Sequence, residues 1–416
     1  MSATESPVRG TTDARTIQGL AGNGRLSAEA GDNALDDRGG LDGRGAALTA
    51  LLAAVRERRA EFEAQRQISD DVIEMMKAVG IYRALVARRF GGDEMPPGDF
   101  LRLIETISQA DGSAGWVASF GVSAIYLSAL PVATLESIYA KGPDVVFAGG
   151  IFPPQKAVRV EGGLEVTGRW SWGSGCTGAA LIGVGIKVEG GGATDRLPRM
   201  AVMPRGKVRI VRNWDVNGLK GTGSHDMAVD KVVVPESWTF LRGGPSSLDT
   251  PLFRYPPLAL AAQVLAVVGL GVARAALDEI VAIAGDRPSI TGAPPLAERA
   301  YVQAEIARAE AELRSARAFF YEVTEQAFAT LLAGDPLDLQ RRALLRLSAS
   351  HAARVGADVA QTAYRVSGTT GIFTAHPIAR HFQDALVVPQ HTFLSDGTWQ
   401  SAGRILLGFE ATPAFP

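Results

Sequence analysis

The spacing of apolar residues divides the chain into a helical part, a part with short strands and a second helical part. Between residues 45 and 140, apolar side chains recur at the intervals of amphipathic helices. The first helix shows this i, i+3, i+4, i+7 spacing in Leu48, Leu51, Leu52 and Val55. Ser69 and Gly80 bracket a second helix as its N-cap and C′ residues. A further helix is expected over 100–109 and a buried one over 115–130, so we predict an N-terminal helical domain.

Short β-branched runs replace the helical spacing between residues 141 and 245. Turns rich in Gly and Pro separate these runs, and Glu161-Gly162-Gly163 is expected to close a tight hairpin. Many short strands within about a hundred residues are typical of a small barrel or sandwich. The sequence therefore predicts a central β-domain of one of these two kinds.

Helical spacing returns over residues 246–416, in long segments at 258–284, 296–332 and 337–366. Long amphipathic helices of this kind are typical of a four-helix bundle, which often buries its remaining apolar face in an oligomer. The predicted fold class is therefore α+β multidomain, with a helical domain, a β-domain and a helical bundle in that order. Residues 1–44 contain no aromatic residue, so we expect them to form a disordered tail.

Composition and charge exclude several classes of function. The 416 residues carry a formal net charge of −2, which gives no electrostatic reason to expect nucleic acid or an anionic membrane as a partner. The apolar run 258–273 is too short to cross a bilayer comfortably, so a buried helix is expected. The single cysteine, Cys176, excludes an intrachain disulfide and is expected to be a buried small residue. With no visible signal peptide, the cytoplasm is the simplest location.

Several standard catalytic signatures are absent from the sequence, including the P-loop, the G-x-S-x-G elbow and the H-E-x-x-H motif. The five histidines form no ligand pattern with carboxylates, so no metal site is expected. Gly269-Leu270-Gly271 lies within helical spacing, and we expect it to permit close helix packing rather than to bind a dinucleotide.

What remains is a set of small, hydroxyl and aromatic residues clustered in three segments, 110–120, 168–176 and 220–226. Each segment by itself is also compatible with an ordinary turn. Together they supply flat aromatic surface, hydroxyl groups and exposed backbone N–H groups. A planar heteroaromatic cofactor requires this combination.

Four motifs carry a specific resemblance. They are ADGSAGW (110–116), GLEVTGRWSWGSGC (163–176), GLKGTGSHDMAVDKVVVPE (218–236) and PQHTFLSDGTWQSAGRILLG (389–408). In this order, and within a helical, strand and helical chain, they resemble the flavin-dependent monooxygenase branch of the acyl-CoA dehydrogenase superfamily. That branch comprises the oxygenase components of two-component aromatic hydroxylases. The resemblance covers about residues 46–410.

The resemblance implies an acyl-CoA dehydrogenase-like fold and a reduced flavin, supplied by a separate NAD(P)H:flavin reductase. We expect FMN, with FAD as the alternative, because no adenine-binding stretch is identifiable. O2 would add at flavin C4a, and the C4a-hydroperoxide would transfer one oxygen atom to an aromatic or polyketide-like small molecule. The resemblance also implies a homotetramer assembled through the C-terminal bundle.

Individual residues acquire roles through the same resemblance. The segment 170–175 would lie along the isoalloxazine ring, so Trp170 and Ser171 are expected to bind flavin. Ser174 is expected on the N5/C4a side as a catalytic hydrogen-bonding residue, with a turn-capping serine as the alternative. The other expected flavin-binding residues are Trp116, Gly149, Gly150, Arg287, Ser367, Thr369 and Thr370. Arg287 would contact the flavin phosphate of a neighbouring subunit, unless it is a surface cation, and Trp116 is equally compatible with a core position.

His391 is the principal catalytic candidate. It follows Pro389-Gln390 in a predicted loop between helices rather than lying on an apolar helix face. An imidazole near flavin C4a can act as an acid or a base at neutral pH. His225 is a weaker candidate, since histidines in turns commonly only close loops.

Two other functions stay open at this point. Asp396, in a Ser-Asp-Gly-Thr segment, resembles the Glu-Gly-Thr base of acyl-CoA dehydrogenases. It would serve as the base of an acyl-CoA dehydrogenase-like or nitroalkane-oxidase-like flavoprotein. A flavin-fold binding or scaffold subunit without catalysis is the third possibility.

Overall fold

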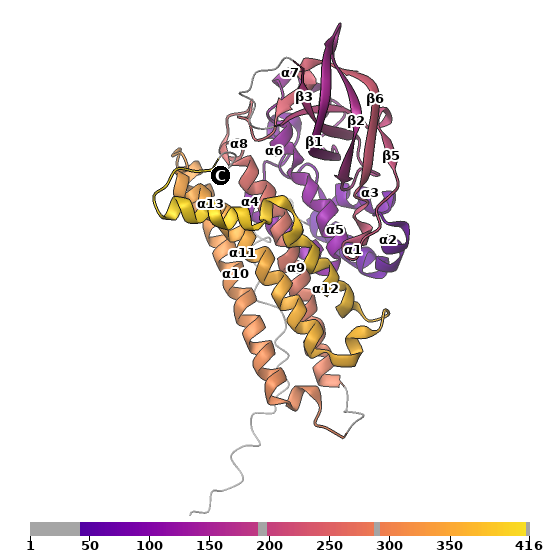
Figure 1. Cartoon of the computed structure of the whole chain (residues 1–416), viewed down its shortest axis with the longest axis vertical. Helices are drawn as coiled ribbons and strands as arrows, with labels where there is room; N and C mark the ends of the chain where they lie inside the picture. The colour runs from indigo at the N-terminus through magenta and orange to yellow at the C-terminus, as the bar shows by residue number, and fades with distance from the viewer. Residues whose placement is uncertain (1–41, 190–197, 287–291, 413–416) are drawn as a thin grey trace, which may run out of the picture.

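The structure is a computed structural model that describes residues 42–189, 198–286 and 292–412 (Figure 1). Its N-terminal helices are α1 (Asp42–Glu57), α2 (Arg59–Gln65), α3 (Asp70–Val79), α4 (Pro97–Ala110), α5 (Gly112–Ala118), α6 (Ser123–Leu127) and α7 (Val132–Tyr139). Because α1 begins at Asp42, residues 42–44 are helical rather than part of the expected tail. Extending a packed helix by a few residues costs little once its nucleus has formed. The expected tail up to residue 41 and Arg287 lie outside the described residues.

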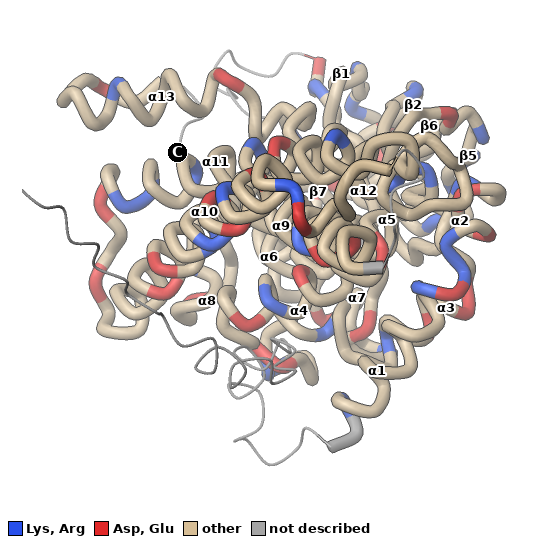
Figure 2. Tube along the Cα trace, turned by 90° about the horizontal axis from the view of Figure 1, so that it is seen from below, with Lys and Arg blue, Asp and Glu red and all other residues tan. Residues whose placement is uncertain are grey.

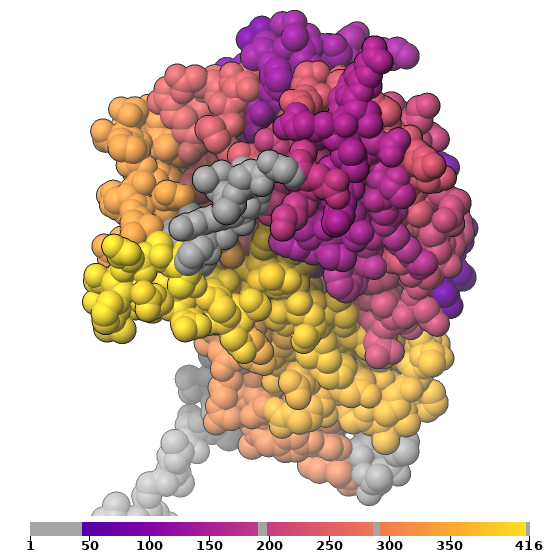
Figure 3. Space-filling model, turned by 45° about the horizontal axis from the view of Figure 1, so that its top comes forward, coloured from indigo at the N-terminus to yellow at the C-terminus, as the bar shows by residue number. Residues whose placement is uncertain are grey.

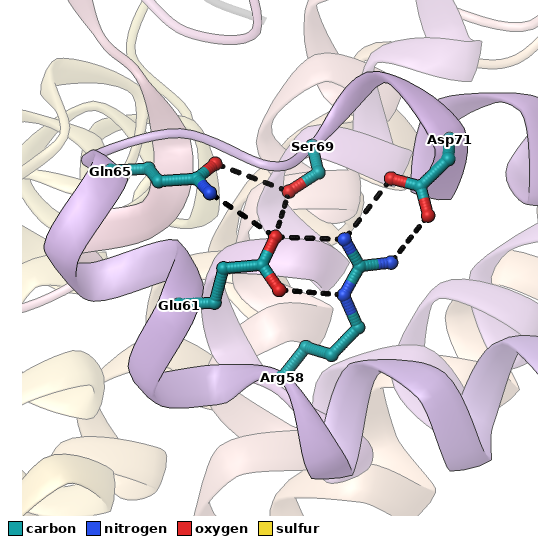
Figure 4. A network of polar contacts seen from close by, with 5 residues as sticks. All are labelled: Arg58, Glu61, Gln65, Ser69 and Asp71. Carbon is teal, nitrogen blue, oxygen red and sulfur yellow. Dashed lines mark hydrogen bonds and ion pairs between the residues drawn. The ribbon is translucent and has the colours of Figure 1, made fainter.

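A network of polar contacts joins α2 to α3 (Figure 4). Arg58 donates to Glu61 at 2.8 Å and to Asp71 at 2.5 Å. Ser69 lies at the N-cap of α3 as predicted, but its hydroxyl donates to Glu61 at 2.5 Å and forms no capping hydrogen bond. The hydrogen bonds from Arg58 are the main reason that the pKa of Glu61 falls to about 2. The network therefore fixes the turn between α2 and α3.

The strands of the described residues form one seven-stranded sheet in the order β5-β6-β2-β1-β3-β4-β7. They are β1 (Phe147–Val160), β2 (Gly163–Gly173), β3 (Leu181–Val188), β4 (Arg199–Pro204), β5 (Arg209–Val211), β6 (His225–Val234) and β7 (Thr239–Leu241). Within residues 42–189 and 198–286, only β1 and β3 pair in parallel. The predicted hairpin is confirmed, since Val160 pairs with Gly163. Among the described strands, the pairing order has two edges, β5 and β7, and therefore does not close into a barrel.

The C-terminal part contains α8 (Pro251–Arg254), α9 (Pro257–Asp286), α10 (Ala300–Leu332), α11 (Leu339–Val366), α12 (Pro377–Val387) and α13 (Asp396–Leu406). Helix α9 lies at the centre and packs against α4, α10, α11 and α12. By length and composition α9 could cross a membrane, but 89% of its most apolar window is buried inside the protein. Lys, Arg, Asp and Glu are interspersed along the described trace (Figure 2).

Two features of α9 explain irregularities in its apolar sequence. Gln263 is completely buried, and it accepts a hydrogen bond from Tyr255 at 2.9 Å and donates to Thr324 at 2.6 Å. A Cβ added at Gly271 would lie 2.5 Å from the carbonyl oxygen of Glu105 in α4. The expectation that the Gly269–Gly271 pair serves helix packing is therefore confirmed at Gly271.

We expect Gly271→Ala to lower the free energy of unfolding by about 1–3 kcal/mol, because the added methyl group overpacks the α4–α9 contact. Gly285→Ala is the matched control in the same helix, since no atom lies within 4 Å of its added Cβ. That variant should be neutral or stabilise by up to about 1 kcal/mol. Urea denaturation of both variants checks this, and equal stabilities would contradict the tight contact.

Candidate functional site

Residues from all four sequence motifs meet between the sheet and the helices. Trp116 of α5 donates from Nε1 to Ser174 Oγ, just after β2, at 3.1 Å. The imidazole of His391 lies 6.1 Å from the Trp116 ring between centroids. His391 follows the short helix η8 (Val388–Gln390), so its predicted place between two helices, α12 and α13, is confirmed. In Figure 3 the C-terminal residues in yellow lie beside the strand residues in magenta.

Hydroxyl groups extend this contact into a chain with a fixed direction. Ser174 Oγ lies 2.7 Å from Ser224 Oγ, which lies 2.7 Å from Thr222 Oγ1. Thr222 donates to the carbonyl oxygen of Leu219 at 3.0 Å. A hydroxyl group has one proton, so Ser224 must donate to Thr222 and Ser174 must donate to Ser224. Ser174 therefore accepts from Trp116, donates into the chain, and keeps one lone pair for a further donor.

A buried carboxylate holds the end of this chain. Leu219 has a φ of +52°, which is uncommon for a residue other than glycine, and precedes the short helix η4 (Lys220–Thr222). Its N–H donates to Asp384 Oδ1 of α12 at 2.5 Å. Burial raises the pKa of Asp384 to about 7, and the nearby Asp111 adds to the effect. Asp111 itself caps α5 by accepting from the Ala114 N–H at 2.8 Å.

His391 is held in one tautomer. Its Nδ1 accepts the backbone N–H of Phe393 at 3.2 Å, at the start of the short helix η9 (Thr392–Leu394), so Nε2 carries the proton of the neutral ring. Burial lowers the pKa of His391 to about 4, and the cations Arg242 and Arg346 add to the shift. At neutral pH the imidazole is therefore a neutral hydrogen-bond donor. This sharpens the acid-or-base role expected from the sequence, because the imidazolium form is scarce.

Two guanidinium groups lie beside Phe393, whose ring contacts His391 at 5.0 Å between centroids. The Cζ atoms of Arg242 and Arg346 are each 5.8 Å from the Phe393 centroid. Burial lowers the pKa of both arginines, that of Arg346 to about 10. Sequence reasoning missed both residues and also Asp384. An isolated arginine after a short strand, or within an amphipathic helix, carries no periodic signal that would reveal it.

The predicted flavin-binding segment of β2 presents a different indole from the one expected. Trp170 is completely buried and donates to the carbonyl oxygen of Gly185 at 2.8 Å, so its ring belongs to the core of the sheet. Trp172 is 66% exposed and has a φ of +61°. The register of β2 against β6 shifts between Trp170 and Gly173, which breaks the simple alternation of faces. Ser171 is half-buried and hydrogen-bonds the carboxylate of Asp226.

Gly149 and Gly150, two of the expected flavin-binding residues, lie within β1. They pair with Gly183 and Val184 of β3. A Cβ added at Gly150 would meet Met227 Cε at 2.8 Å and Ser171 O at 3.1 Å. Packing across the sheet thus accounts for glycine at this position. Cys176 is buried as expected, and burial raises the pKa of its thiol to about 11.

The hydroxyl residues after α11 lie far from this site within the chain. Ser367 is buried and donates to the Tyr364 carbonyl oxygen at 2.6 Å, while Thr369 is exposed and Thr370 is partly exposed. They follow the end of α11 at Val366, whereas Arg346 in the same helix contacts the His391 loop. Twenty helical residues span about 30 Å. The structure therefore does not bring Ser367, Thr369 and Thr370 together with Ser174 and His391 in one chain.

Asp396 is in the first turn of α13, with its side chain 89% exposed and 3.0 Å from Arg354. An exposed, ion-paired carboxylate lacks the desolvation that makes a strong buried base. A pocket of about 670 Å³ elsewhere is lined by the 243–249 loop, the 253–257 segment and the turn between α10 and α11. That pocket includes none of Trp116, Ser174 and His391. Among the described residues, no group of three or more His, Cys, Asp and Glu could hold a metal ion.

Comparison with known proteins places this geometry in context. Residues 263–396 match the family model "Acyl-CoA dehydrogenase, C-terminal domain". The chain is 56% identical to an indole-3-acetate monooxygenase from Pseudomonas putida, over 89% of this chain and 96% of that protein. It is 48% identical to an indole-3-acetate monooxygenase from Acinetobacter baumannii, over 88% and 95% of the two chains. It is also 28% identical to the oxygenase subunit of a flavin-dependent monooxygenase from Rhodococcus jostii, over 81% and 91%.

Solved structures show the same fold. The crystal structure of 3-HSA hydroxylase from Rhodococcus sp. RHA1 is similar with a TM-score of 0.82 and 25% identity, over 89% of this chain and 98% of that one. The structure of XiaF from Streptomyces sp. in complex with FADH2 and glycerol has a TM-score of 0.83 and 19% identity, over 90% and 97%.

The fixed direction of the hydroxyl chain predicts a difference between two substitutions at Thr222. Thr222→Val keeps the shape but removes the acceptor of Ser224 and one donor to Leu219, so it should destabilise the protein by about 1–3 kcal/mol. Thr222→Ser keeps the hydroxyl group and should cost less. Thermal and urea denaturation measure both, and equal losses would show that the chain contributes nothing beyond packing.

The lowered pKa of His391 predicts a pH-dependent contribution to stability. A desolvated imidazole with a pKa of about 4 in the folded state, against 6.5 ordinarily, stabilises the fold above pH 6.5. That contribution is lost as the pH falls towards 4. His391→Asn keeps a side-chain acceptor for the Phe393 N–H but cannot titrate. The stability of the wild type relative to this variant should therefore decline between pH 6.5 and 4 in urea titrations, and a constant difference would contradict the shift.

Proposed function

Since the chain belongs to the flavin-dependent monooxygenases with the acyl-CoA dehydrogenase fold, we propose that it hydroxylates an indole-type aromatic acid, with indole-3-acetate as the first candidate. It is the oxygenase component of a two-component system, and a separate reductase supplies its reduced flavin. The observation that supports the site is the convergence of Trp116, Ser174 and His391 from three distant segments.

The residues present fit a reduced flavin. When bound, this cofactor supplies two electrons and activates O2, so that one oxygen atom enters the substrate and the other leaves as water. Ser174 has one lone pair outside the hydroxyl chain and can accept the N–H that a reduced flavin carries at N5. The neutral His391 offers an N–H donor at Nε2, with its ring 6.1 Å from the Trp116 ring between centroids. Trp172 adds an exposed flat ring at the end of β2.

The chain's own residues divide the work of the reaction. The ordered hydroxyl chain fixes the orientation of Ser174, because its proton is already committed to Ser224. The half-buried His391 can hold a proton at Nε2 without carrying a charge that would attract water. Trp116 positions Ser174 and forms an apolar wall against the imidazole.

The finer features of the cofactor and the assembly follow the same reasoning. We propose FMN as the preferred flavin, supported by the lack of an identifiable adenine-binding stretch in the sequence. We also propose a homotetramer in which Ser367, Thr369 and Thr370, distant from the site of their own chain, reach the flavin phosphate of a neighbour. Flavin titration with FMNH2 and FADH2, and mass measurement in solution, test these two points.

Reaction of the protein with reduced FMN, O2 and indole-3-acetate should yield a hydroxylated product. We expect His391→Asn and Ser174→Ala to lower the product yield per flavin oxidised by ~10–100-fold while hydrogen peroxide increases, because proton transfer and orientation contribute factors of that size. Product analysis and peroxide assays measure the two outcomes.

Asp396→Asn is the matched control and should retain the coupling of the wild type. If Asp396→Asn alone abolished substrate oxidation and His391→Asn did not, the base-dependent flavoprotein would be the correct function. Failure of the wild type to bind flavin would favour a non-catalytic subunit.

A further inference from the structure

Arg242, directly after β7, is a buried cation without an anionic partner. Its side chain is only 5% exposed, and its Nη1 is buried with no hydrogen-bond partner. Within the described part of the chain, no carboxylate contributes to its electrostatic environment. Buried charges in proteins are normally paired, because moving an ion out of water is costly. The position of Arg242 therefore requires a partner that the described chain does not supply.

The contacts of Arg242 with the protein do not meet this requirement. Its Cζ lies 3.5 Å from the ring centroid of Tyr126, a close cation–π contact, and its side chain also hydrogen-bonds that of Tyr126. Such a contact offsets only part of the cost of burying an ion. Burial raises the pKa of Tyr126, so its phenol is neutral at neutral pH and is not the missing anion.

Arg242 lies at the edge of the site already described. Its Cζ is 5.8 Å from the Phe393 ring, and Phe393 contacts His391 at 5.0 Å. Arg346 lies on the same ring at 5.8 Å and donates to the Phe393 carbonyl oxygen at 3.3 Å. Trp116, His391 and Phe393 are thus successive aromatic rings that end at positive charge. This is a suitable surface for a flat molecule with an anionic end.

The length of an arylacetate matches this arrangement. A carboxylate on a one-carbon side chain reaches roughly 4 Å from its ring atom, and a charge-assisted hydrogen bond adds about 2.8 Å. An aromatic ring held beside His391 and Phe393 therefore brings its carboxylate within reach of the Arg242 guanidinium.

We propose that Arg242 binds the carboxylate of the aromatic acid substrate and thereby selects anionic over neutral indoles. This rests on the proposed function, because the ring must lie against His391 for the carboxylate to reach Arg242. Arg346 contributes a second positive charge to the same end of the site. The competing occupant is the negative charge of the reduced flavin itself, which the experiment below separates from the substrate.

The test compares indole-3-acetate with indole-3-acetamide, which has the same shape without the charge. Dissociation constants are measured by calorimetry on the flavin-loaded protein, together with kcat/KM. The wild type should bind the acid at least ~10-fold more tightly than the amide, and Arg242→Gln should weaken acid binding by ~10–100-fold while changing amide binding by less than ~3-fold. Arg242→Lys should recover part of the loss. Arg254→Gln is the matched control, since Arg254 is exposed and pairs with Asp249.

Three outcomes would overturn the proposal. The first is equal affinity of the wild type for the acid and the amide. This result needs no variant, so the proposal can be tested even if Arg242→Gln does not fold. Parallel losses for both ligands would indicate packing only. A loss of affinity for reduced flavin with an unchanged acid-to-amide ratio would assign the cation to the cofactor. If the wild type instead prefers the acid but oxidises no indole with reduced flavin and O2, the proposed function fails and the assignment of Arg242 stands.

Discussion

A one-directional chain of hydrogen bonds runs from the Trp116 indole to the Leu219 carbonyl oxygen, and the bond from the Leu219 N–H to Asp384 joins it to the C-terminal helices. Leu219 has a left-handed backbone conformation, and its N–H donates to the buried Asp384 side chain of α12. Each hydroxyl group has one proton, so anchoring the last acceptor sets the direction of every donor before it. Ser174, at the other end, therefore keeps one lone pair on Oγ that can accept a hydrogen bond from a further donor. The chemistry expected at this position thus depends on a carboxylate in a different part of the chain.

Desolvation decides the charge of the groups that surround this chain. It lowers the pKa of His391 so that the ring is neutral, and it raises the pKa of Asp384 to about 7, against the lowering effect of the hydrogen bond from the Leu219 N–H. It cannot make arginine neutral, so Arg242 and Arg346 keep their charges at the edge of the site. The result is a neutral aromatic surface bordered by two cations. A site of this kind favours a flat substrate with an anionic end over an uncharged one.

The fold also places residues that are close in sequence in different environments. Trp170 and Trp172 are two residues apart, yet the irregular register of β2 sends one ring into the core and leaves the other exposed. His391 and Asp396 are five residues apart, yet one is enclosed by aromatic rings and cations while the other forms a surface ion pair. Short separation in sequence therefore did not imply a shared function. The enclosed imidazole, not the exposed carboxylate, has the environment of a catalytic group.

The sequence by itself determined the order of the parts, most helix positions, the 160–163 hairpin and the four motifs, because periodicity, caps and turn residues act locally. It also singled out His391, Ser174 and Trp116. Only the tertiary structure decided that Trp170 belongs to the core, that the strands form one sheet with two edges, and that Asp384 and Arg242 belong to the site. The physical reason is that charge state and hydrogen-bond direction depend on neighbours brought together from distant segments. No local pattern in the sequence records those neighbours.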